Sequence, residues 1–143
     1  MSAKKQVLIL CTGNSARSQI AEGLLRYLAD DRFVVESAGV EPSVVRPEAI
    51  DVMREIGVDI SSHRSKSVDE FTGRKFNYVI TVCDHARQLC PTFPGSPVTL
   101  HWSIEDPATT QGEREVRLKA FRKARNELHR RLAEFIKDRD TLQ

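Results

Sequence analysis

This sequence has few cysteines, no long apolar run and almost no excess of charge of either sign. No apolar stretch approaches the roughly 20 residues that a membrane-spanning helix needs, so we expect no membrane segment. The 22 basic and 20 acidic residues nearly cancel to a net charge of +2, which gives no reason to expect nucleic acid as a partner. The three cysteines are an odd number, which argues against the disulfide framework of a small secreted protein.

What remains is the composition of an ordinary globular protein. The chain has 143 residues, of which 40% are hydrophobic and 29% charged. This length favours one domain, residues 1–143, with a substantial core. The apolar segment VLIL that follows the basic start MSAKK is too short for a signal-peptide core, so we expect a cytoplasmic protein. We also expect a monomer.

Apolar patterning alternates between strand and helix signals along the chain. Uninterrupted apolar runs predict buried strands over residues 6–11, 33–39, 78–83 and 97–102. Apolar residues at helical spacing predict helices over residues 18–28, 47–57 and 113–139. The order β-α-β-α-β-β-α favours an α/β fold, with a small four-stranded parallel sheet covered by helices on both faces.

The segment CTGNSARS stands between the first predicted strand and the first predicted helix. Open α/β sheets bind ligands in such loops, because free amides and the dipole at a helix start favour an anion. We therefore predict an oxyanion-binding loop made of Thr12, Gly13, Asn14, Ser15, Ala16, Arg17 and Ser18.

Cys11 is the predicted nucleophile of this loop. Arg17 offers a planar pair of donors for two oxygens of one anion, and it would also stabilise Cys11 as a thiolate. Ser18 is placed to donate a hydrogen bond to the same sulfur. The alternative is a buried structural Cys11 with no connection to Arg17.

Transfer of an anion also needs a proton donor for the departing oxygen. Asp106 in HWSIEDPA is the candidate, because it follows the fourth predicted strand and reaches the pocket if its loop packs on the sheet edge. Glu105 is the alternative, and either residue could instead be an acid that begins a helix.

Two further cysteines stand in TVCDHARQLCP, with Cys83 at the end of the third predicted strand and Cys90 seven residues later. Adjacent parallel strands end at the same edge of a sheet, so Cys83 is expected near Cys11. If residues 84–89 are helical, the Cα atoms of Cys83 and Cys90 lie about 10 Å apart, whereas a disulfide needs about 4.4–6.8 Å. A bond between them would require this helix to unwind, and we predict a redox switch in this segment.

Two other interpretations of Cys83 and Cys90 stay open. Their spacing is wider than the two to four residues typical of a zinc pair, although His85 and His101 are further possible ligands. Both thiols could also be buried side chains without a chemical role. We expect no bound metal.

Five stretches of the chain together resemble a known family: CTGNSARSQIAEG, ESAGVEP, DISSHRSKSVDEF, VITVCDHARQLCP and HWSIEDPA. They are similar to the thioredoxin-coupled arsenate reductases, which share the fold of low-molecular-weight protein tyrosine phosphatases. The resemblance covers nearly the whole chain. It implies Cys11 as nucleophile, Arg17 as oxyanion clamp, Asp106 as general acid, and Cys83 with Cys90 as the resolving pair.

The resemblance also implies a reaction and its partners. Arsenate would be reduced to arsenite for arsenic detoxification, and phosphate or sulfate would compete for the loop. A disulfide would pass from Cys11–Cys83 to Cys83–Cys90 and then be reduced by thioredoxin. Thioredoxin would thus be an external reductant, with no cofactor bound.

Some positions depart from the pattern of the family. Ala16 stands where some relatives have another cysteine, to which we assign no catalytic role. Some relatives bind potassium through positions that match Asn14, Glu22, Ser37 and a carboxylate aligned with Lys66. A lysine ammonium can replace the ion and pair with Glu22, so we expect no potassium site here.

A tyrosine phosphatase of the same fold is the main alternative function, because phosphate and arsenate share shape and charge. A phosphatase needs no resolving thiols, and Ala108 stands where phosphatases of this fold usually carry a tyrosine. Weak phosphatase side activity is still expected. A thiol sensor that binds phosphate without turnover is a second alternative.

Overall fold

A four-stranded sheet with helices around it forms the fold in the computed structural model, which describes residues 4–141. The predicted domain, residues 1–143, extends past the described residues at both ends. The strands are β1 (Lys5–Cys11), β2 (Phe33–Gly39), β3 (Tyr78–Thr81) and β4 (Val98–His101). The α-helices are α1 (Arg17–Ala29), α2 (Pro47–Arg54), α3 (Asp84–Leu89) and α4 (Arg114–Thr141), and two 3-10 turns are η1 (Val68–Phe71) and η2 (Pro107–Thr109).

The strands are all parallel and lie in the order β2-β1-β3-β4. This confirms the predicted small parallel sheet. The central strand β1 pairs with β2 through Leu10 and Ala38, and with β3 through Leu10 and Thr81. Because these carboxyl ends are level, the loops after β1 and β3 leave the sheet side by side.

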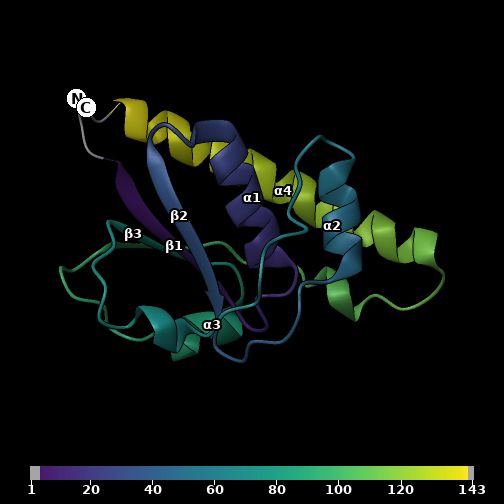
Figure 1. The fold of residues 1–143 in the computed structure, drawn as a ribbon, viewed down its shortest axis with the longest axis horizontal. Helices are drawn as coiled ribbons and strands as arrows, with labels where there is room; N and C mark the ends of the chain where they lie inside the picture. Colours follow the sequence, from purple (N-terminus) through teal and green to yellow (C-terminus); the bar gives the residue numbers. More distant parts are fainter. Residues whose placement is uncertain (1–3, 142–143) are drawn as a thin grey trace.

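Helices cover both faces of the sheet, as predicted. Tyr78 points toward α4, where its ring packs edge-on against Phe135 at a centroid distance of 5.1 Å. Val79 and Thr81 point to the opposite face and line a groove together with Cys90 at the end of α3. Figure 1 shows α1 and α4 packed beside each other, with α3 apart from them near the arrowhead of β2.

The structure corrects the sequence prediction around the third strand. β3 ends at Thr81, two residues before Cys83, and the segment that the predicted order left without an element forms the short helix α3. Cys83 keeps an extended backbone and serves as the N-cap residue of α3, because its sulfur accepts a hydrogen bond from the Ala86 amide. The fourth strand is likewise shorter than predicted and ends at His101.

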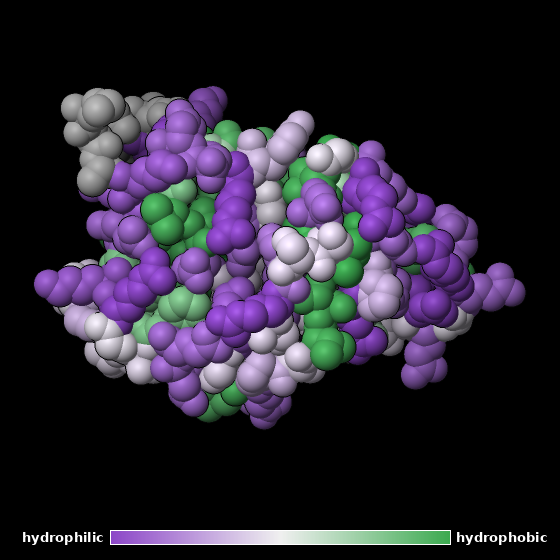
Figure 2. Space-filling view, viewed as in Figure 1, coloured by the Kyte–Doolittle hydropathy of each residue, from purple (hydrophilic) through white to green (hydrophobic). Residues whose placement is uncertain are grey.

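Polar side chains dominate the face of the molecule shown in Figure 2. The face in Figure 2 carries apolar residues only as small patches separated by hydrophilic ones. No helix within residues 4–141 combines the length and the apolar character needed to cross a membrane, and the 28-residue α4 is rich in charge.

Candidate active site

The loop after β1 curves around the sulfur of Cys11. The Asn14 amide donates to this sulfur over 3.2 Å, and the Ser18 hydroxyl lies 2.8 Å from it. The Ser18 oxygen also accepts a hydrogen bond from Asn14 Nδ2 over 2.7 Å. Since that bond occupies the hydroxyl oxygen as an acceptor, the Ser18 hydrogen is free to point at the sulfur. The predicted donation from Ser18 to Cys11 therefore has the geometry it needs.

The loop backbone is held from outside by other segments. The carbonyl of Thr12 accepts from the Glu41 amide, and the carbonyl of Gly13 accepts from the Ser43 amide and from Ser65 Oγ. These carbonyls therefore point away from the sulfur, whereas the Asn14 amide points toward it. This is the backbone arrangement that an anion cradle needs, and the loop is called the cradle below.

Two backbone positions make this tight curve possible. Asn14 has a φ of 49°, in the left-handed region that asparagine tolerates better than most residues. Gly39, at the end of β2, approaches the loop so closely that a Cβ there would lie 2.6 Å from the Thr12 carbonyl oxygen and 2.8 Å from the Asn14 nitrogen. Only glycine fits this position without moving the loop.

Burial sets the protonation of Cys11. Only 2% of this residue is exposed, and burial raises the pKa of its thiol above the ordinary value. Hydrogen bonds from Ser18, the charge of Arg17 and the Asn14 amide lower the pKa but do not cancel this rise. Burial therefore works against the predicted thiolate, and the donors around the sulfur limit the cost of forming it.

Arg17 and Asp106 meet above the loop. Arg17 Nη1 donates to the Ile104 carbonyl over 3.0 Å, and Nη2 lies 3.5 Å from Asp106 Oδ2. Asp106 is also the N-cap residue of η2, where its Oδ1 accepts from the Ala108 amide over 2.9 Å. The structure thus brings the two residues together and shows that Asp106 is an acid that begins a helix, while its role as proton donor stays a prediction.

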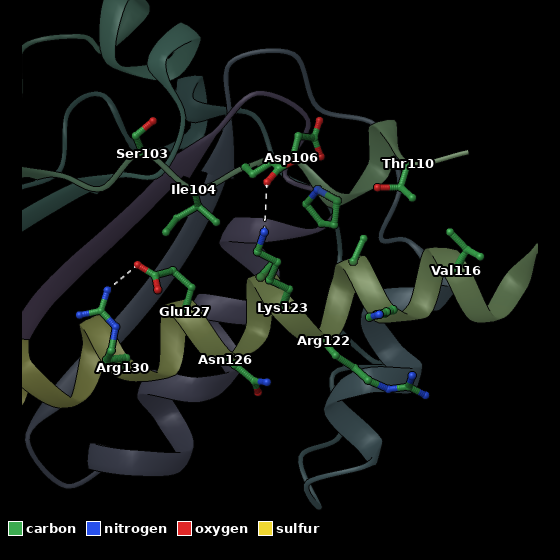
Figure 3. Close-up of a pocket in the computed structure, with 15 residues that line it drawn as sticks. Ser103, Ile104, Asp106, Thr110, Val116, Arg122, Lys123, Asn126, Glu127 and Arg130 are labelled. Atoms are coloured by element: carbon green, nitrogen blue, oxygen red, sulfur yellow. Dashed lines mark hydrogen bonds and ion pairs between the residues drawn. The ribbon is translucent and has the colours of Figure 1, made fainter. Parts of the chain in front are cut away.

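Glu105 does not share this position. Its side chain is 84% exposed and forms an ion pair with Lys123 of α4. Glu105 and Asp106 both border a groove of about 910 Å³ between residues 103–110 and α4, on whose rim Lys123 also lies (Figure 3), but it is Asp106 that pairs with Arg17. The geometry therefore favours Asp106 over Glu105 as the acid of the site.

The other two cysteines stand at the two ends of α3. Cys83 Sγ lies 3.2 Å from the hydroxyl of Thr12, the residue that follows Cys11, so Cys83 borders the cradle as predicted. Cys90 is the C-cap residue of α3, and partial burial raises the pKa of its thiol. The three thiols are free, and the helix between Cys83 and Cys90 is present. Residues 84–89 are thus helical, which is the condition under which we predicted that this helix must unwind before Cys83 and Cys90 can form a disulfide.

A buried charge cluster lies behind the cradle. Lys66 Nζ is 3.5 Å from Glu22 Oε1, which confirms the predicted pairing of these two residues. Glu22 also pairs with Arg26 over 2.7 Å and accepts from the Ser37 hydroxyl over 2.6 Å. Asn14 Nδ2 donates to Ser37 Oγ, so the cluster connects to the loop that holds Cys11.

Sequence reasoning missed the part that two histidines take in this arrangement. His63 lies 3.5 Å from Glu22 and hydrogen-bonds Gln19, which donates in turn to Asn14. Burial lowers the pKa of His63, against the charge of Glu22, which raises it. His101 bridges Thr81 and Asp84. A single histidine leaves no periodic signal in a sequence, and no pattern would have placed either one.

Metal ligands do not gather within residues 4–141. No group of three or more histidine, cysteine, aspartate or glutamate side chains in this range is arranged to hold a metal ion. His101 is bound to Asp84 and Thr81 rather than paired with both cysteines.

Comparison with known proteins places the chain in a family. The family model of the low molecular weight phosphotyrosine protein phosphatases matches residues 6–142, so the chain belongs to this family. Within it, several similar curated proteins are arsenate reductases. The arsenate reductase of Halalkalibacterium halodurans is 41% identical over 132 residues, which cover 92% of this chain and 95% of the relative.

Solved structures agree with this grouping. An arsenate reductase in the oxidized state has a TM-score of 0.81 at 32% identity, covering 94% of this chain and 98% of the other. A thioredoxin-dependent arsenate reductase of Corynebacterium glutamicum has a TM-score of 0.77 at 31% identity, covering 99% of this chain and 65% of the other.

Proposed function

We propose that this protein reduces arsenate to arsenite through Cys11, Cys83 and Cys90, and that thioredoxin restores the reduced enzyme. The observation that carries the proposal is the position of Cys83. Its sulfur contacts Thr12, the residue next to Cys11, and Cys83 is the N-cap residue of the helix whose C-cap residue is Cys90. The proposed nucleophile Cys11 thus has Cys83 in contact with its neighbour in the chain, and Cys90 lies at the other end of the same short helix. The similarity to arsenate reductases supports the same assignment.

Arsenate binding would use the loop amides and Arg17. The amides at the start of α1 and the guanidinium favour a tetrahedral anion, and phosphate or sulfate would compete for the same donors. An anion in the pocket would have to compete with Asp106 and the Ile104 carbonyl for the donors of Arg17. Binding would therefore weaken the contact between Arg17 and the loop that carries Asp106.

The first chemical step joins sulfur to arsenic. Cys11 attacks arsenic, and Asp106 protonates the departing oxygen, which leaves as water. Cys83 then attacks the Cys11 sulfur: a sulfur–sulfur bond forms, the sulfur–arsenic bond breaks, and its electron pair stays on arsenic. Arsenite leaves, and the two electrons it carries come from the two thiols.

The second step moves the disulfide from Cys11–Cys83 to Cys83–Cys90, at the two ends of α3. Cys90 attacks Cys83, which releases Cys11 and leaves a Cys83–Cys90 disulfide for the external reductant. Because α3 separates the two residues, it would unwind in this step. We propose thioredoxin as that reductant, no bound cofactor, a monomeric state and a cytoplasmic location for detoxification.

A phosphatase is the second candidate, because the loop amides and Arg17 suit phosphate as well as arsenate. The two functions differ in what Cys83 and Cys90 do. A phosphoryl-cysteine is hydrolysed by water without either thiol, whereas reduction needs both.

The test measures arsenate-dependent NADPH oxidation in the presence of thioredoxin and its reductase. The wild type should consume NADPH only with arsenate, and Cys11→Ser, Cys83→Ser and Cys90→Ser should each abolish this consumption. Hydrolysis of p-nitrophenyl phosphate by the same variants is the matched comparison. Of the three cysteines, this reaction should need only Cys11. Full arsenate turnover in Cys83→Ser or Cys90→Ser would refute the cascade, and activity with glutaredoxin instead of thioredoxin would change the partner. Oxidant-driven disulfides without turnover would instead support a thiol sensor.

A further inference from the structure

His101 connects the sheet to the helix that separates Cys83 from Cys90. Its Nε2 lies 2.8 Å from Asp84 Oδ1 in the first turn of α3, and its Nδ1 lies 2.7 Å from Thr81 Oγ1 at the end of β3. In the neutral ring Nε2–H donates to Asp84, and Nδ1 accepts from the Thr81 hydroxyl at a shorter distance than the 3.5 Å contact of this hydroxyl with the Leu100 carbonyl. Both ring nitrogens are then occupied, so the imidazole is fixed.

The helix that His101 holds is short. α3 has six residues, and a helix of this length is unstable in water without tertiary contacts. One local cap and two tertiary contacts support its first turn. The Cys83 sulfur caps the Ala86 amide over 3.4 Å, Asp84 binds His101, and His85 lies 3.8 Å from Glu41. Both partners of the last pair are largely exposed, so that pair contributes little.

The position of His101 also relates it to the third thiol. A groove of about 460 Å³ between α3 and β4 is lined by Cys90, Arg87 and His101, together with Val79 and Thr81 of β3. Arg87 and Cys90 are the other titratable or charged groups that line this groove.

We propose that His101 is a positioning residue for the exchange of the disulfide from Cys83–Cys11 to Cys83–Cys90, an inference that rests on the proposed function. By binding Asp84, His101 keeps α3 helical while the thiols are reduced, and so keeps Cys90 out of reach of Cys83. Formation of the Cys11–Cys83 disulfide weakens the cap of the first turn, because the sulfur that accepts from the Ala86 amide is then bonded to Cys11 and is drawn toward it. The Asp84–His101 bond is then the remaining restraint, and its rupture lets α3 unwind.

The exchange itself needs no further oxidant. Cys90 attacks Cys83 Sγ, the bond between the sulfurs of Cys83 and Cys90 forms, and the bond between those of Cys83 and Cys11 breaks. Cys11 leaves as a thiolate, and the proton of Cys90 passes to water. His101 affects only how often α3 opens far enough for this attack.

Hydrogen exchange of the α3 amides tests the restraint directly. In the fully reduced protein, His101→Leu removes both ring nitrogens, and peptides covering residues 84–90 should exchange about two- to fivefold faster, as expected for one partly exposed hydrogen bond to a carboxylate. His101→Gln keeps a donor for Asp84 and should exchange like the wild type. Asp84→Ala, at a side chain that is 73% exposed, removes the same bond from the other side and should match His101→Leu.

His85→Leu is the control, since it changes a histidine of the same turn whose ion pair is long and exposed. It should alter the exchange rate by less than about twofold. The proposal is overturned if His101→Leu and Asp84→Ala exchange like the wild type, or if His101→Gln exchanges as fast as His101→Leu.

A second measurement follows the thiols themselves. In a Cys11→Ser background, Ellman's reagent first forms a mixed disulfide with Cys83 or Cys90, and the other thiol then displaces a second thionitrobenzoate as the ring closes. His101→Leu should speed this closure about two- to fivefold, and His101→Gln should not. Unchanged closure in His101→Leu would also count against the restraint. Absence of arsenate turnover would refute the proposed function but leave both measurements valid.

Discussion

Removal of the Ser18 hydroxyl should make Cys11 a weaker nucleophile by raising the pKa of its thiol further. Ser18 Oγ lies 2.8 Å from the sulfur, neither residue is more than 2% exposed, and the bond from Asn14 Nδ2 leaves the hydroxyl hydrogen for the sulfur. A hydrogen bond to a charged group contributes about 1.5–3 kcal/mol, which corresponds to about 1–2 pH units. Ser18→Ala should therefore lower the thiolate fraction at neutral pH about 10- to 100-fold.

The assay is the pH dependence of Cys11 alkylation by iodoacetamide, with Cys83 and Cys90 changed to serine so that one thiol reports. The midpoint for Ser18→Ala should move to higher pH, while the exposed control Ser103→Ala should keep that of the parent protein. Melting temperatures of the three proteins check that the fold is intact. An unchanged or lower midpoint in Ser18→Ala would refute the assignment of the hydroxyl as the donor to sulfur.

Three further changes test other parts of the site. Asp106→Asn should lower kcat for arsenate about 10²- to 10⁴-fold, because it removes the proton donor while leaving the loop in place, and steady-state turnover with thioredoxin measures this. Exchange of potassium for sodium should leave thermal stability and rate almost unchanged, and a large, specific effect of potassium on the wild type would contradict this account. Lys66→Met should lower the free energy of unfolding by about 1–3 kcal/mol in urea titrations, since the buried Glu22 loses one of its partners. Burial raises the pKa of Cys11 in the folded state, so its thiol contributes stability below the ordinary pKa of 9.0, and this stability is lost as pH rises through the folded pKa. Between about pH 8 and pH 10, Cys11→Ala should therefore lose less stability than the wild type. Equal losses in both proteins would count against a raised pKa.

The sequence predicted the central strand β1 well because that strand is buried on both faces. In β1, the residues from Val7 to Leu10 are fully buried, so the strand appears as an uninterrupted apolar run. The loop after it was predictable for a related reason, since a cysteine and an arginine at this spacing suit an anion at a helix start. The Lys66–Glu22 pair followed from the resemblance and the charge of the lysine, and the structure contains it.

Contacts that depend on tertiary packing were beyond the sequence. The end of β3 could not be placed, because the apolar run continues through Val82 to Cys83 while a short helix begins at Asp84. Nothing in the chain indicates that Arg17 binds the Ile104 carbonyl, which is 87 residues away. The raised pKa of Cys11 was missed as well, because a sequence displays the donors around a thiol but not the depth of its burial.

Gly39 sets a practical limit on redesign of this pocket. Its Cα hydrogen faces the backbone of the loop that holds the sulfur, and the contact leaves no room for even a methyl group. An attempt to enlarge the cradle for a bulkier oxyanion by substitutions within the loop would therefore push against β2. A library for altered substrate size would do better to vary the end of that strand together with the loop, treating the two backbones as a single wall.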